Sequence, residues 1–156
     1  MRLLGSALLF ALVAFGADNS LGTWILDVSK SSTTPIPKNP AKAQTNVREA
    51  IGGSVKVTIT EELADGKTNR SSAVYKYDGQ PAEIVGFPTY DRVAAKQIDA
   101  NHFVNERWKE GGQFRVKSEI TISDDGRTMT ITTTGTNATG EPLKVLQVYH
   151  KQEHQP

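Results

Sequence analysis

Apolar and polar residues alternate along most of the chain after Gln44. In the stretch VKVTIT, Val55, Val57 and Ile59 share one face, and the stretches at 114–122 and 128–134 keep the same period of two. Such a period is typical of β-strands with one buried face. We therefore predict strands near residues 22–28, 45–51, 54–63, 68–77, 81–85, 91–99, 102–109, 113–122, 127–136 and 142–151.

Short turn signals separate these predicted strands. Gly-Gly occurs at 52–53 and 111–112, and Asp-Gly at 65–66, 78–79 and 125–126. These dipeptides supply the positive φ that tight hairpins need, so neighbouring strands should form an antiparallel meander. A long meander loses its open edges by closing on itself. We predict an all-β, lipocalin-like barrel of eight to ten strands; a two-sheet sandwich, which needs longer crossing connections, is the alternative.

The segment SSTTPIPKNPAKAQ lies between the first two of these strands. It carries Pro35, Pro37 and Pro40. Proline lacks the backbone N–H group that helices and central strands require, so the segment is predicted to be an extended crossover.

The N-terminal stretch MRLLGSALLFALVAFGA has the three parts of a secretory signal peptide in their usual order. Arg2 precedes an apolar run from Leu3 to Phe15, and small residues follow. The run is shorter than the roughly 20 residues of a membrane-spanning helix. We predict cleavage after Gly16 or Ala17, so that residues 1–17 form the signal peptide and 18–156 a single barrel domain in the periplasm or outside the cell.

Composition narrows the partners of the chain. It contains no cysteine, which excludes disulfides, thiolate metal sites and a lipid-modified cysteine. Lys and Arg number 18 against 17 Asp and Glu, and these charges are interspersed. Nucleic acids and anionic membranes need a concentrated basic face, so we expect neither as a partner. We expect a monomer.

The sequence resembles the calycin superfamily, which comprises lipocalins and fatty-acid-binding proteins. The resemblance begins with Gly22-Thr23-Trp24 on the first strand, within LGTWILDVSKS, and it includes YKYDGQP, KQIDANHF and DDGRTMTITTTGTNATGEP. The mature chain is most similar to a group of small exported bacterial proteins with a lipocalin-like barrel and no assigned function, so this resemblance implies a fold and leaves the function open. The resemblance implies that Trp24, with Gly22 beside it, plugs one end of the barrel.

The chain departs from these families in three places. Fatty-acid-binding proteins have two helices where this chain has its Pro-rich crossover. They also anchor a ligand carboxylate with an Arg two residues before a Tyr on the last strand, where LQVYHK has Gln147 before Tyr149. Lipocalins pack an Arg over the Trp, and the last strand here offers Lys144 and Lys151. A neutral Gln favours a neutral ligand over a charged fatty acid.

No catalytic or metal-binding motif stands out. The histidines His102, His150 and His154 lack metal-ligand spacing on one strand face, and the acidic pairs at 61–62 and 124–125 lie beside turns. Neither a nucleophile elbow nor a phosphate or dinucleotide loop is present. We therefore expect no cofactor, no metal and no enzymatic activity.

Six polar residues are the candidates for a ligand site because their strand neighbours suggest an inward face. They are Tyr75, Tyr77, Asn105, Arg107, Gln147 and Tyr149. Aromatic groups with a few convergent polar groups are typical of a small-molecule pocket. The alternative is a packed core in which Tyr and Gln bond each other, with Arg107 pointing outward.

Two functions follow from these observations. The first is an exported protein that binds a small, mostly apolar or neutral molecule inside the barrel. The second is an interaction or envelope module with a filled barrel, which acts through its loops.

Overall fold

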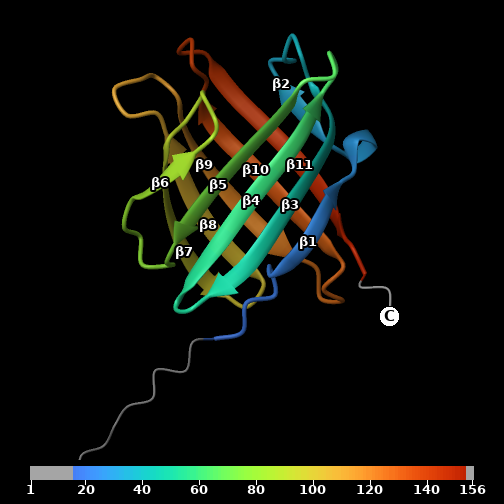
Figure 1. Ribbon diagram of the computed structural model, residues 1–156, viewed down its shortest axis with the longest axis vertical. Helices are drawn as coiled ribbons and strands as arrows, with labels where there is room; N and C mark the ends of the chain where they lie inside the picture. The colour runs from blue at the N-terminus through green and yellow to red at the C-terminus, as the bar shows by residue number, and fades with distance from the viewer. Residues whose placement is uncertain (1–15, 154–156) are drawn as a thin grey trace, which may run out of the picture.

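The computed structural model describes residues 16–153 and shows an antiparallel β-meander with almost no helix (Figure 1). One 3-10 turn, η1 (Val28–Lys30), follows the first strand. The strands are β1 (Gly22–Leu26), β2 (Ser32–Thr34), β3 (Ala41–Ile51), β4 (Ser54–Leu63), β5 (Thr68–Tyr75), β6 (Ala82–Val85), β7 (Arg92–Asp99), β8 (His102–Trp108), β9 (Arg115–Ile122), β10 (Thr128–Thr136) and β11 (Pro142–Lys151).

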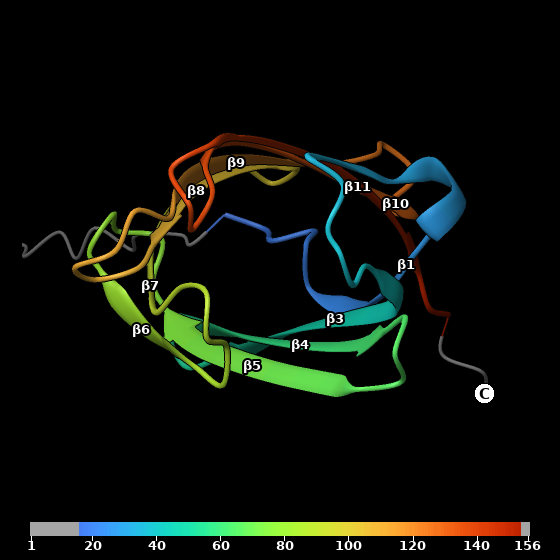
Figure 2. The ribbon, with the colours of Figure 1, turned by 90° about the horizontal axis from the view of Figure 1, so that it is seen from above.

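Ten of the strands close into a barrel, which confirms the predicted fold class. From β3 to β11 each strand pairs with the next one along the chain, and β1 pairs with both β3 and β11. Trp24 lies opposite Lys151, and Ile25 opposite His150, at the junction of the first and last strands. Seen from above, the barrel is flattened, with β3, β4 and β5 on one side and β8 to β11 on the other (Figure 2).

The Pro-rich crossover contains the one strand that the alternation does not predict. Ser32–Thr34, near its start, form β2 and pair with Lys144, Val145 and Leu146 of β11. Pro35 ends the strand because it has no N–H group to continue the ladder. The next strand, β3, begins at Ala41, four residues before the predicted start at 45, since the segment after Pro40 carries no further proline.

Inward residues of the barrel form two apolar clusters. The first, which we call the floor cluster, consists of Trp24, Phe103, Ile120, Ile122, Met129, Ile131 and Tyr149. The second, the wall cluster, consists of Val55, Val57, Ala73, Tyr75, Ile84, Tyr90, Val93, Ala95, Phe114 and Val116. Strand β9 shows the origin of this packing, because its buried and exposed residues alternate without a break from Arg115 to Ile122.

Among residues 16–153 no helix has the length and apolar character needed to cross a membrane. The predicted signal peptide falls largely on residues 1–15, and His154 on the last three residues; both lie outside the described part of the chain.

Candidate functional site

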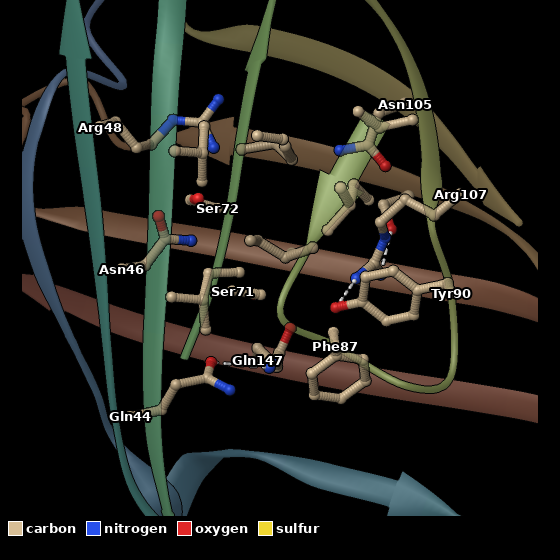
Figure 3. Close-up of a pocket in the computed structure, with 18 of the residues that line it drawn as sticks. Gln44, Asn46, Arg48, Ser71, Ser72, Phe87, Tyr90, Asn105, Arg107 and Gln147 are labelled. Atoms are coloured by element: carbon tan, nitrogen blue, oxygen red, sulfur yellow. Dashed lines mark hydrogen bonds between the residues drawn. The ribbon is translucent and has the colours of Figure 1, made fainter. Parts of the chain in front are cut away.

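The barrel encloses an inner cavity of about 100 Å³. Side chains of both apolar clusters line it, together with polar side chains from β3, β4, β5, β8, β9 and β11 (Figure 3). The polar lining consists of Gln44, Asn46, Arg48, Glu61, Ser71, Ser72, Tyr75, Tyr90, Asn105, Arg107, Ser118, Gln147 and Tyr149. The interior is therefore more polar than the sequence analysis expects.

Strand β3 supplies a row of three inward polar side chains. Gln44, Asn46 and Arg48 are two residues apart and only 9%, 2% and 3% exposed. Sequence reasoning missed this row because its buried face is the polar one. The Gly52-Gly53 hairpin could have revealed this row from the sequence, because a two-residue turn at this position pairs Arg48 with Val57 and Asn46 with Ile59. Paired residues share a face, and Val57 and Ile59 were predicted to point inward.

Arg48 joins the inner cavity to the closed end of the barrel. Its Nε donates to the Ser20 hydroxyl at 3.1 Å, and its Nη2 donates to the hydroxyls of Tyr75 and Tyr77 at 3.4 Å each. Burial raises the pKa of Tyr77 to about 12, so this phenol keeps its proton and donates it to the Asp18 carboxylate at 2.9 Å. The Arg48 guanidinium is thus held by the N-terminal segment.

Trp24 lies in the floor cluster and is fully buried. Its indole Nε1 donates to the Ser20 carbonyl at 2.8 Å, and the Lys151 ammonium lies 5.3 Å from its ring centre. A side chain on Gly22 would come within 2.7 Å of the Lys151 Cε. Gly22 therefore leaves the space through which Lys151 reaches the indole, in the place where lipocalins use an Arg.

Arg107 on β8 points into the inner cavity. Its Nη1 donates to the Tyr90 hydroxyl at 3.1 Å and its Nη2 to the Ser118 hydroxyl at 3.3 Å, while the guanidinium carbon lies 4.8 Å from the Tyr90 ring centre. Its Nε is buried without a partner, as are the amide oxygens of Asn46 and Asn105. Within residues 16–153 no carboxylate comes within 4.0 Å of this guanidinium.

A chain of hydrogen bonds links β11, β3 and β4 at the other end of the cavity. Tyr149 donates its hydroxyl to the Gln44 side-chain oxygen, to which Gln147 also donates at 3.2 Å. Gln44 in turn donates to the Glu61 carboxylate at 3.1 Å, and Asn69 donates to its other oxygen at 3.1 Å. Burial raises the pKa of Tyr149, so its phenol remains a donor at neutral pH.

The structure brings five of the six predicted residues together around one cavity. Tyr75, Asn105, Arg107, Gln147 and Tyr149 all line it. Tyr77 does not, because β5 ends at Tyr75 and the next turn carries Tyr77 to the Asp18 side of Arg48.

A wider opening of about 770 Å³ lies beneath the Pro-rich crossover, and we call it the mouth. It shares Gln44, Glu61, Phe87 and Gln147 with the inner cavity. Its remaining lining combines apolar side chains with the hydroxyl groups of the crossover. The apolar side chains include Leu26, Val28, Ile36, Leu63 and Leu146, and the hydroxyl groups belong to Ser31, Ser32, Thr33 and Thr34. The inner cavity and the mouth thus meet at four shared side chains.

No cluster of metal ligands accompanies these residues. In the part of the chain that the structure describes, no three His, Cys, Asp or Glu side chains are grouped for a metal ion. His102 bonds Asp99 and His150 bonds Asp27, each at the exposed surface.

No protein-family model and no curated protein matches the chain. Among solved structures, it is similar to the S-type phycobiliprotein lyase CPES from Guillardia theta, with a TM-score of 0.54 and 10% sequence identity over 88% of this chain and 90% of that one. At this identity the likeness concerns the fold, and it supports a calycin-like barrel.

The same comparison corrects one expectation. From the sequence we expect a protein without enzymatic activity, whereas this neighbour, a lyase, is an enzyme built on a similar fold. The non-enzyme prediction is therefore contradicted. It rested on missing motifs, and a barrel can carry a reaction on dispersed inward residues that no short motif reports.

Proposed function

We propose that this is an exported protein whose calycin-like barrel binds a small molecule, with the polar end of the ligand in the inner cavity and its apolar part in the mouth. The observation that carries this proposal is the set of buried polar atoms without a partner in the cavity wall: Asn46 Oδ1, Asn105 Oδ1 and Arg107 Nε. Leaving such an atom unsatisfied costs about 1 to 3 kcal/mol. A bound polar group would remove that cost.

The size of the two spaces supports a ligand that extends through both. Pockets for drug-sized molecules measure about 300 to 1,000 Å³, so the inner cavity of about 100 Å³ has room for a small group alone. The mouth, at about 770 Å³, is large enough for the rest of the ligand. The polar lining shifts the expected ligand from a mostly apolar molecule to one with a distinct polar end.

Export is part of the proposal and is supported by the sequence of residues 1–17. The absence of cysteine fits a bacterial periplasm or growth medium better than a disulfide-rich extracellular fluid. The lack of a nucleic-acid partner remains a prediction from the charge pattern, and the monomeric state remains a prediction as well.

Native mass spectrometry of protein purified from its own host tests the binding proposal. A small molecule bound at a ratio of one to one is the expected result. Asn105→Phe should expel it by filling the cavity from β8. Val104→Phe is the matched control, because Val104 pairs with Lys96 and Glu119 on the outer face of the same strand. Retention of the molecule by Asn105→Phe would place it elsewhere.

One observation favours the alternative of an interaction module. Gln44, Glu61, Gln147 and Tyr149 already bond one another, so much of the interior is satisfied without a ligand. Ile36 in the crossover is 85% exposed, which suits a contact with another surface. A clean mass without ligand, together with normal stability of Asn105→Phe, would favour this alternative.

A further inference from the structure

We infer that the inner cavity selects a monocarboxylate that carries a hydroxyl or amino group next to its acidic group, and that Arg107 on β8 is the anchor of the carboxylate. This inference rests on the proposed small-molecule binding and adds the chemical class of the ligand. It replaces the neutral head group that Gln147 suggests in the sequence, because the structure turns Arg107 inward beside Asn105 (Figure 3).

The charge of Arg107 is the first argument. Arg107 is partly buried, and moving a cation even partly out of water is costly unless a counter-charge accompanies it. Arg107 has none within residues 16–153, where its partners are the hydroxyls of Tyr90 and Ser118. These two bonds and the Tyr90 ring hold the guanidinium in place and leave Nε free. A guanidinium presents a fork that matches the two oxygens of a carboxylate.

Arg48 is not the anchor, although it also lines the cavity. Like Arg107, it has two engaged nitrogens, because its Nε donates to Ser20 and its Nη2 to Tyr75 and Tyr77. The difference is that Tyr77 connects Arg48 to the Asp18 carboxylate. The charge of Arg48 therefore has a counter-charge nearby, and within residues 16–153 that of Arg107 has none.

The charge balance of the lining favours a single negative charge on the ligand. Arg107 has no carboxylate within 4.0 Å in residues 16–153, whereas Glu61 lines the other end of the cavity and is bonded to Gln44 and Asn69. A phosphate monoester, which carries about −1.5 to −2 at neutral pH, would exceed this positive charge and face Glu61. A carboxylate matches it.

The two asparagines supply the second half of the specificity. Asn46 on β3 and Asn105 on β8 face the cavity from opposite walls, and the side-chain oxygen of each is buried without a donor (Figure 3). A carboxylate has no hydrogen to offer them. A hydroxyl or amino group on the adjacent carbon does, and it lies within the small space around Arg107.

Calorimetric titration of the mature chain with three six-carbon probes tests the inference. The probes are 2-hydroxyhexanoate, hexanoate and hexane-1,2-diol, which carry both features, the charge alone and the hydroxyls alone. The expected order of affinity is hydroxy acid, then acid, then diol. The preference of the hydroxy acid over the diol should be about tenfold or more, as expected for a hydrogen bond to a charged group.

Variants assign each preference to its residue. Arg107→Gln should remove the preference for the charged probes, and Arg107→Lys, which keeps the charge without the fork, should retain part of it. Arg115→Gln is the matched control, because Arg115 stacks on Trp108 at 5.3 Å on the outer surface. Asn46→Ala and Asn105→Ala should reduce the advantage of the hydroxy acid over hexanoate and leave the advantage of hexanoate over the diol.

The outcomes separate this inference from the proposed function. Equal or tighter binding of the diol, unchanged in Arg107→Gln, would overturn the carboxylate assignment and leave small-molecule binding intact. A neutral molecule co-purified with the protein would do the same. Absence of binding by all three probes and of any co-purified molecule would overturn both. A urea melt of each variant identifies any that fails to fold, and the order of the probes with the unaltered chain does not depend on the variants.

Discussion

At the scale of single residues, the closed end of the barrel depends on a few large side chains with polar contacts. Trp24 contributes an indole that is fully buried and bonded to the Ser20 carbonyl, while Lys151 lies against its ring. Gly22 beside it has a φ of 130°, which other residues rarely adopt, and a Cβ there would displace the end of the Lys151 side chain. Residues distant in sequence therefore meet at one indole.

Replacing Trp24 with Ala should destabilise the protein by about 3 to 5 kcal/mol, because the substitution leaves a large cavity in a packed cluster. That is a large share of the 5 to 15 kcal/mol typical of a domain. Trp108→Ala is the control, since Trp108 lies on the outer side under Arg115. Urea melts measure both, and a loss below about 1 kcal/mol for Trp24→Ala would contradict its role in closing the barrel.

A second residue-scale prediction concerns Asp27. Hydrogen bonds from Ser29 and then from His150 lower the pKa of its carboxyl from 3.8 to about 2. The contribution of this ionised carboxylate to stability is present above pH 4 and is lost as the pH falls towards 2. Asp27→Asn should therefore lower the urea midpoint at pH 5, with the difference from the original chain shrinking between pH 4 and pH 2.

The control for this measurement is Asp124→Asn. Asp124 forms no side-chain hydrogen bond in the described part of the chain, so the urea midpoint of this variant should follow that of the original chain across the same range. A constant deficit of Asp27→Asn at every pH would mean that the effect does not arise from the charge.

The candidate site could be predicted from the sequence only where polar residues share a strand face with apolar or aromatic ones. This marked Tyr75, Asn105 and Tyr149. The inward residues of β3 were not predicted, because polar Asn46 and Arg48 occupy its buried face and apolar Val47 its outer face, which is the reverse of the usual pattern. The unpaired charge of Arg107 could not be predicted either, since it depends on which side chains surround it in three dimensions.

At the scale of elements, the segment between β6 and β7 shapes one wall of the cavity. It places the Phe87 ring 4.6 Å from that of Tyr90, which stacks at 5.2 Å on Phe114. Gly86 makes this possible, because a Cβ there would lie 2.2 Å from the Arg70 carbonyl oxygen.

The alternation of apolar and polar residues predicted where the barrel strands lie. It did not predict β2, since three residues before a proline are too few to show a period.

Gly86→Ala should therefore displace the segment 86–91 and weaken the support of Arg107 by Tyr90. Gly66→Ala is a matched control: both glycines have a φ of 86°, and the added Cβ at Gly66 meets open space. Each variant bears the cost of a left-handed alanine, about 1 to 2 kcal/mol. Only at Gly86 does the clash with the Arg70 carbonyl oxygen add to this cost.

Urea melts should show a greater loss of stability for Gly86→Ala, and amide hydrogen exchange should show faster exchange in 86–91 in that variant alone. Equal losses in the two variants would mean that the segment adjusts without strain on the cavity wall.

At the scale of the whole molecule, closure follows from the length and regularity of the meander. The short Gly-Gly and Asp-Gly turns predicted the neighbours of each strand, and the pairing of β1 with β11 completes the ring. Function could not be predicted to the same degree. The same fold carries a lyase in the similar solved structure, and a fold alone does not determine a function.

The last prediction concerns export, and the structure adds a reason for the position of cleavage. The segment around the predicted cleavage site is bonded to the barrel. Gln97 donates to the carbonyl of Ala17, the last residue of the predicted signal peptide, at 2.9 Å. Just after it, Asn19 donates its N–H to the Ala100 carbonyl at 3.0 Å, and Tyr77 donates to the Asp18 carboxylate. Cleavage after Gly16 retains all three bonds, and cleavage after Ala17 loses the first. We expect an exported chain that begins at Ala17.

Intact-mass measurement of protein from the periplasm or medium of a bacterial host checks this expectation. The control variant is Leu8→Arg, which interrupts the apolar run and should therefore stay in the cytoplasm at full length. Exported protein that still carries Met1 to Ala17 would contradict the prediction.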